Sequence, residues 1–98
     1  MKHELKTWPD QFKGIWNGSK KFEVRKNDRP FFVQDTLLLR EYEPSSKQYT
    51  GRECEVLVTY ILRAPFHGLC SDYCIMSIDI IRRAIYSDLV HGILKKEE

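Results

Sequence analysis

The sequence predicts a small, mostly β domain: an antiparallel β-barrel with one flanking helix near the N-terminus and an amphipathic helix at the C-terminus. Residues 53–62 and 73–80 alternate apolar and polar side chains, as strands do. Residues 8–16 instead repeat their apolar side chains at helical spacing. The connecting segments are short, and 98 residues suit one domain. Closing the sheet into a barrel removes exposed strand edges, which is useful in so small a domain.

The first elements are a short strand over residues 3–6 and the early helix. Thr7 is the expected N-cap of this helix, and Pro9 lies in its first turn, where proline is tolerated. Gly18 follows Asn17 and is expected to end the helix in a left-handed conformation. Four apolar residues at helical spacing define its expected buried face: Trp8, Phe12, Ile15 and Trp16.

The remaining elements are predicted as strands, over residues 22–26, 35–43, 53–62 and 73–80. Alternation in the last two predicts the inward-facing residues, which are Cys54, Val56, Val58, Tyr60, Cys74, Met76, Ile78 and Ile80. Apolar residues then recur every four positions at Ile81, Ile85 and Leu89, which predicts an amphipathic helix over Ile81–Leu94. The sequence therefore divides into a domain over residues 1–80 and a C-terminal extension over residues 81–98.

Composition narrows the class of protein and its compartment. The chain contains no apolar stretch near the ~20 residues that a membrane-spanning helix needs. The residues after Met1 lack the apolar core of a signal peptide. Three cysteines cannot form a closed set of disulfides, which favours a reducing compartment. We therefore expect a cytoplasmic protein with no membrane partner.

Positive charge is concentrated in the segment Gly18–Arg29. This segment has five basic and two acidic side chains, a net charge of +3, while the whole chain is +2 and the remainder therefore −1. On a strand over residues 22–26, Glu23 and Arg25 share one face, where they can pair or jointly hold a polar ligand. Such a patch suits an anionic partner, most commonly phosphate. The plainer alternative is a solvated turn beside a charged strand edge.

Two familiar kinds of site are disfavoured, the first by its spacing and the second by the expected burial of its cysteines. A phosphate-binding P-loop would need a glycine-rich turn that opens a helix, whereas Gly18 ends one. His67, Cys70 and Cys74, with Cys54 as a fourth ligand, would have to converge tetrahedrally around zinc. Cys54 and Cys74 are instead expected in the core, where free cysteine is common. The sequence therefore predicts no metal and no cofactor.

The charged segment contains Gly18-x-Lys20-x-x-Glu23-x-Arg25, and this spacing resembles the G-x-K-x-x-E-x-R motif of the ASCH superfamily, a branch of the PUA-like β-barrels. The ordered blocks around it, from about His3 to Ile80, are similar to a bacterial and phage subfamily of ASCH-like proteins without a known function. The resemblance implies a PUA-like barrel with a cleft between barrel and helix. In relatives the motif residues, here Lys20, Glu23 and Arg25, line that cleft, and the superfamily is generally regarded as RNA-binding.

The expected function is therefore binding of RNA, preferably single-stranded, or of a nucleotide. Lys20, Lys26 and Arg29 would contact phosphate. Glu23 and Arg25 would face a base edge or hold each other in place. The candidates for stacking on a base are Trp8, Tyr42 and Tyr73, although core packing is the preferred reading of Trp8.

Two alternatives belong to other classes. Some ASCH relatives hydrolyse the acetyl group of N4-acetylcytidine with a lysine and a threonine; Lys20 matches the lysine, but Glu23 stands at the threonine position. A hydrolase of a modified nucleoside would then use Lys20 to stabilise the anion or to activate water, and Glu23 as base. The third alternative is a protein-interaction adaptor, in which an amphipathic helix over Ile81–Leu94 caps the barrel or pairs with another copy of the chain.

Overall fold

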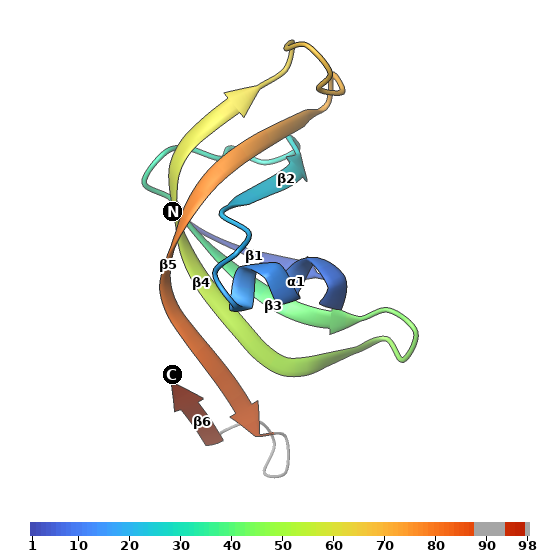
Figure 1. Ribbon diagram of the computed structural model, residues 1–98, viewed down its shortest axis with the longest axis vertical. Helices are drawn as coiled ribbons and strands as arrows, with labels where there is room; N and C mark the ends of the chain where they lie inside the picture. Colours follow the sequence, from blue (N-terminus) through green and yellow to red (C-terminus); the bar gives the residue numbers. More distant parts are fainter. Residues whose placement is uncertain (88–93, 98) are drawn as a thin grey trace.

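The chain folds into one strongly curled β-sheet that holds a short helix on its concave side (Figure 1). The computed structural model describes residues 1–87 and 94–97. In chain order the elements are β1 (Lys2–Thr7), α1 (Pro9–Trp16), β2 (Phe22–Lys26), β3 (Thr36–Glu43), β4 (Gln48–Arg63), β5 (Tyr73–Ser87) and β6 (Leu94–Glu97). The predicted mostly β class with one N-terminal helix is confirmed.

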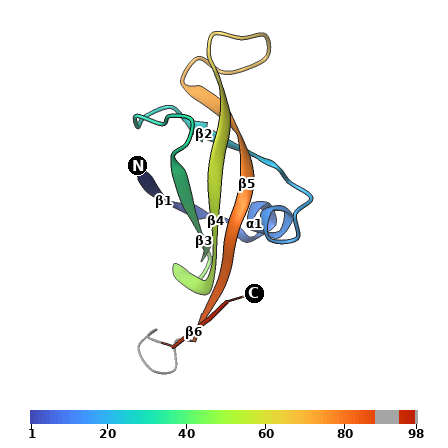
Figure 2. The same ribbon diagram turned by 90° about the vertical axis from the view of Figure 1, so that its left-hand side faces the viewer.

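The strands follow the order β1-β3-β4-β5-β2, and β6 pairs with the far end of β5. The long strands β4 and β5 run side by side along the molecule (Figure 2). Every pair is antiparallel except β1 with β3, whose parallel pairing is possible because α1 and β2 intervene in the chain. The sheet curls into a half-barrel whose outer strands are β1 and β2.

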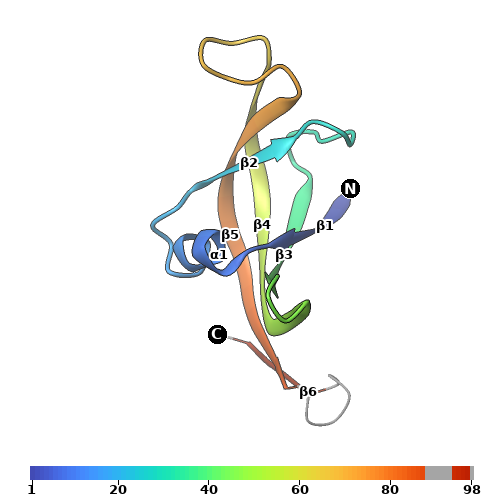
Figure 3. The same ribbon diagram turned by 90° about the vertical axis from the view of Figure 1, so that its right-hand side faces the viewer.

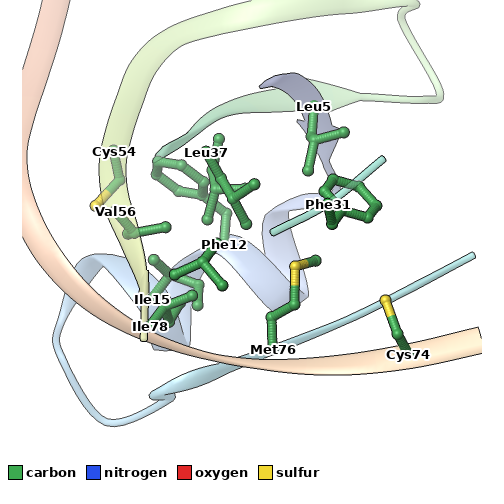
Figure 4. Packing of buried hydrophobic residues seen from close by; sticks show 12 residues of the cluster. Leu5, Phe12, Ile15, Phe31, Leu37, Cys54, Val56, Cys74, Met76 and Ile78 are labelled. Carbon is green, nitrogen blue, oxygen red and sulfur yellow. The ribbon is translucent and has the colours of Figure 1, made fainter. Parts of the chain in front are cut away.

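The core lies between the concave face of the sheet and α1 (Figure 4). Phe12 and Ile15 on α1 are fully buried, as the helical spacing predicts. The sheet contributes the predicted inward residues Cys54, Val56, Val58, Cys74, Met76 and Ile78, together with Leu37 and Leu39. Gly18 ends the helix with φ +85°, so its predicted capping role is also confirmed. The alternating pattern therefore identified the core correctly on β4 and β5.

The predicted C-terminal helix over Ile81–Leu94 is wrong for residues 81–87, which continue β5 as a strand. Arg52 pairs with Ile85, and Glu55 pairs with Arg82, so β4 supplies backbone partners along this stretch. Long-range pairing of this kind overrides a local four-residue period. Residues 88–93 lie outside the described part of the chain. The expected division after residue 80 falls inside β5.

Two side chains predicted to be buried are exposed. Trp8 is 62% exposed, because it is the N-cap residue, with extended φ −69° and ψ 152°, and so does not share the apolar face of α1. The expected N-cap, Thr7, is instead the last residue of β1. Tyr60 is 63% exposed because the pairing register shifts between Val58 and Tyr60, and such a bulge reverses the side-chain alternation.

A polar cluster fixes the loop before β3. His3 Nε2 lies 2.9 Å from Asp35 Oδ2, the Phe32 N–H donates to the same oxygen at 3.0 Å, and the Met1 amino group donates to Oδ1 at 3.0 Å. Burial by itself would raise the pKa of Asp35, but these hydrogen bonds outweigh it and lower the pKa from 3.8 to about 2. The ionised carboxylate therefore stabilises the folded state.

Asp35→Asn is expected to lower the free energy of unfolding near neutral pH by about 1–3 kcal/mol, because it weakens several buried polar contacts. The pKa of Asp35 is lower in the folded state, so its contribution is complete above pH 3.8 and disappears as the pH falls towards 2. Urea unfolding of wild type and variant across this range measures the difference, which should shrink as the pH falls. A difference that stays constant with pH would contradict this account.

Candidate functional site

A cleft of about 580 Å³ opens between the end of β1, the start of α1 and strand β2. Figure 3 shows these three elements on one side of the molecule. The residues that line the cleft are Lys6, Thr7, Trp8, Gln11, Lys20, Phe22, Glu23, Val24, Arg25 and Tyr73. Lys20, Glu23 and Arg25 thus line a single cavity, together with two of the three candidate stacking residues, Trp8 and Tyr73.

The turn after α1 places Lys20 against the helix. Gly18 adopts φ +85°, which reverses the chain, and the Lys20 N–H then donates to the Gly14 carbonyl at 2.9 Å. A Cβ on Gly14 would lie only 2.9 Å from the Cβ of Lys20, so glycine is required for this close approach. The lysine side chain is therefore directed across the first turns of α1, where its Nζ donates to Gln11 Oε1 at 2.8 Å.

Glu23 is the buried carboxylate of the cleft, with only 2% of the residue exposed. Arg25 Nε donates to Glu23 Oε2 at 2.8 Å. Lys20 Nζ lies 3.5 Å from Glu23 Oε1, which is an ion-pair distance longer than a good hydrogen bond. Two cations therefore flank one buried carboxylate, and this pairing compensates for the cost of burying its charge.

Arg25 also joins the two outer strands of the half-barrel. Its Nη2 donates to the Lys6 carbonyl and to Thr7 Oγ1, both on β1 and both at 3.0 Å. Arg29 Nη1 donates to the Glu4 carbonyl on the same strand at 3.3 Å. The Arg25 guanidinium thus bridges β1 and β2, which are not paired with each other through their backbones, and Arg29 joins the loop after β2 to β1. This structural role of the two arginines was not predicted from the sequence.

The other predicted site residues are placed differently. Tyr73 lines the cleft and is 38% exposed, whereas Tyr42 lies outside it, packed edge-on against Tyr49 at 5.1 Å. Lys26 is exposed on β2 and does not line the cleft. Arg29 lines an adjacent hollow of about 470 Å³, which shares Lys6 and Arg25 with the cleft. The basic residues therefore extend beyond the cleft along one side of the half-barrel.

Sequence reasoning missed Lys6, Thr7 and Gln11 as cleft residues. Gln11 follows Trp8 by three positions, and helical periodicity brings residues at this spacing close together. This spacing could have identified Gln11 as a neighbour of Trp8 in the cleft. Lys6 and Thr7 reach the cleft only because the sheet curls and brings the end of β1 beside β2. No local pattern carries that information.

Cys54 and Cys74 lie in the core, as the sequence predicts. Cys54 and Cys74 are fully buried, and burial raises the pKa of the Cys54 thiol to about 11, while Cys70 is exposed. Within residues 1–87 and 94–97 no three histidine, cysteine or acidic side chains are grouped so that they could hold a metal ion.

The comparisons with known proteins give a family but no activity. In the described part of the chain, no helix has the length and apolar character needed to cross a membrane. No curated protein matches the chain. A family model described as a domain of unknown function, DUF3850, matches residues 2–78. Because this match covers most of the 98 residues, the chain belongs to the DUF3850 family.

Proposed function

We propose that this protein binds single-stranded RNA, or a nucleotide, in the cleft between β1, α1 and β2. The observation that carries the proposal is the buried Glu23 carboxylate, flanked by Lys20 and Arg25, in a cavity lined by the exposed side chains of Trp8 and Tyr73. At about 580 Å³ the cavity has the size of a small-molecule site and is large enough for a nucleobase. The likeness of the Gly18–Arg25 spacing to the ASCH motif supports the same function.

Each part of a nucleotide has a counterpart at this site. An unpaired base stacks on an aromatic face, and Trp8 and Tyr73 offer such faces at the cleft. The buried Glu23 accepts hydrogen bonds from a base edge. Lys6, Lys20 and Arg29 bring positive charge to the cleft and the adjacent hollow, where phosphates of a bound strand would lie.

Lys20→Ala is expected to weaken single-stranded RNA binding about 3–10-fold at low salt, because it removes one cation from the cleft. The slope of log affinity against log salt concentration should fall by about 0.7, the value for one phosphate contact on a single strand. Fluorescence anisotropy with a labelled oligonucleotide at several salt concentrations measures both quantities. Lys13→Ala is the matched control, since Lys13 is exposed on α1 but does not line the cleft.

Equal affinities and equal salt slopes for Lys20→Ala and Lys13→Ala would contradict binding in the cleft. The same preparations, incubated with N4-acetylcytidine, test the hydrolase alternative, which depends on the ion pair of Lys20 and Glu23. Cytidine formed by wild type and not by Lys20→Ala would favour the hydrolase. The adaptor alternative loses its main support, because residues 81–87 form a strand instead of an amphipathic helix.

A further inference from the structure

We propose that the site holds two successive nucleotides of an RNA strand, one in the cleft and the next in the adjacent hollow. This inference rests on the proposed function, and it selects a strand over a free nucleotide as the ligand. The residues that line the hollow are Glu4, Leu5, Lys6, Arg25, Arg29 and Tyr49. The inference depends on the two residues that the hollow shares with the cleft and on Tyr49.

The two cavities adjoin, and each is large enough for part of a ligand. The cleft measures about 580 Å³ and the hollow about 470 Å³, both within the range of small-molecule pockets. Lys6 and Arg25 line both cavities, so these two side chains lie at their border. In an RNA strand a negatively charged phosphodiester joins each nucleoside to the next. The border is therefore where the linking phosphate of a strand that fills both cavities would lie.

The two shared cations retain donors for a phosphate. Arg25 uses Nε for Glu23 and Nη2 for the Lys6 carbonyl and Thr7. Its Nη1, on the edge of the guanidinium away from Glu23, keeps two N–H donors. Lys6 Nζ lies 4.4 Å from the centre of the Tyr42 ring. Across residues 1–87 and 94–97, no carboxylate lies within ion-pair distance of Lys6.

The hollow differs from the cleft in how its charges are compensated. In the cleft, the buried Glu23 carboxylate offsets part of the positive charge. The carboxylate that lines the hollow belongs to Glu4, and Arg40 Nη1 binds it at 2.7 Å. Arg29 makes a 3.3 Å hydrogen bond to the Glu4 carbonyl and, within the described residues, has no carboxylate partner. The hollow therefore keeps positive charge that attracts the backbone of a strand.

Tyr49 offers a surface for the second nucleoside. It is 40% exposed, and it lines the hollow but not the cleft. The Arg40 guanidinium lies 3.8 Å from the centre of the Tyr49 ring and covers one face, and Tyr42 packs edge-on at 5.1 Å. The part of the ring that stays exposed can contact a base or a sugar, and aromatic side chains contribute to single-strand binding in this way without regard to sequence.

Competition among short probes tests the inference. A labelled uridine hexamer is displaced from the protein by UMP or by the dinucleotide UpU, and fluorescence anisotropy follows the displacement. UpU has a single phosphate, as UMP does, and carries less negative charge, so bulk charge cannot explain tighter binding of UpU. UMP with its phosphate at the 5′ or the 3′ position covers both directions of the strand. UpU is expected to compete about tenfold better than either form of UMP, the gain from one additional base contact.

A substitution in the hollow locates the second nucleoside. Tyr49→Ala should remove most of the advantage of UpU and leave the affinity for UMP unchanged, because Tyr49 does not line the cleft. Unchanged UMP affinity also shows that the variant is folded. Tyr49→Phe keeps the ring and should keep the advantage. Tyr60→Ala is the matched control, since Tyr60 is another exposed tyrosine of β4, 63% exposed, and lines neither cavity.

The outcomes separate the two proposals. Equal competition by UpU and UMP would overturn the two-nucleotide site and leave nucleotide binding in the cleft in place. An advantage of UpU that persists in Tyr49→Ala would overturn the placement of the second nucleoside in the hollow. If neither the hexamer nor any nucleotide binds to the wild-type protein, the proposed function itself is wrong, and the two-nucleotide site fails with it.

Discussion

Arg25→Ala is expected to lower the free energy of unfolding by about 3–5 kcal/mol, the range found when one partner of a buried ion pair is removed. The substitution leaves the Glu23 carboxylate, 2% exposed, without its hydrogen bond from Arg25 Nε. It also removes the donors to the Lys6 carbonyl and to Thr7, which join the two outer strands of the half-barrel. Lys20, at 3.5 Å from Glu23, compensates only part of this loss.

Urea unfolding followed by circular dichroism measures the effect. Lys26→Ala is the matched control, because Lys26 is the next residue on β2, is exposed and also carries one positive charge. A surface substitution of this kind changes stability by about 0.5 kcal/mol or less. The cost of Arg25→Ala should shrink in a Glu23→Gln background, since no buried charge then remains unpaired. Similar losses for Arg25→Ala and Lys26→Ala would show that Arg25 does not hold the half-barrel together.

Phe12→Ala is expected to lower the free energy of unfolding by about 3–5 kcal/mol, because it opens a cavity in the core. Phe12 is fully buried, and its ring stacks on Trp16 with centroids 5.7 Å apart. The guanidinium of Arg52 lies 5.4 Å from the centre of the Phe12 ring and also pairs with the buried Glu41. Phe12 therefore anchors α1 on the sheet, together with the fully buried Ile15.

The substitution should also weaken RNA binding, since α1 carries Gln11 and begins beside Trp8, both of which line the cleft. Thermal unfolding and the anisotropy titration measure the two effects on the same protein sample. Phe32→Ala removes the same side chain from a position that is 61% exposed, and it should change stability by about 0.5 kcal/mol or less. If the two substitutions had equal effects on stability, Phe12 would not anchor α1 in the way described.

Most of the fold was predictable because local patterns matched the tertiary structure. Alternation identified the buried residues of β4 and the first half of β5, and helical spacing identified Phe12 and Ile15. Prediction from the sequence failed where long-range contacts determine the secondary structure or the direction of a side chain. The backbone pairing of β4 with residues 82–85 makes a strand of a segment with a helical period. A bulge at Val58/Tyr60 reverses the alternation that placed Tyr60 inside.

The sequence predicted which site residues share a face of β2, but it did not predict the contacts that these residues make. A strand over residues 22–26 puts Glu23 and Arg25 on one face, and both line the cleft. The apolar residues of that strand, Phe22 and Val24, are 46% and 45% exposed, so on β2 the polar face is the inner one. Burial of Glu23 depends on Lys20 and Arg25, and the bridge from Arg25 to β1 depends on the curl of the whole sheet.

The central claim is that RNA binds in the cleft between β1, α1 and β2. Titration of the ¹⁵N-labelled protein with a uridine hexamer, followed by amide chemical shifts, tests where the ligand binds. The account predicts that the largest shifts occur at residues 6–11, 20–25 and 73, while those in the turn between β3 and β4 stay unchanged. Large shifts confined to residues outside the cleft, or no shifts at saturating RNA, would contradict it.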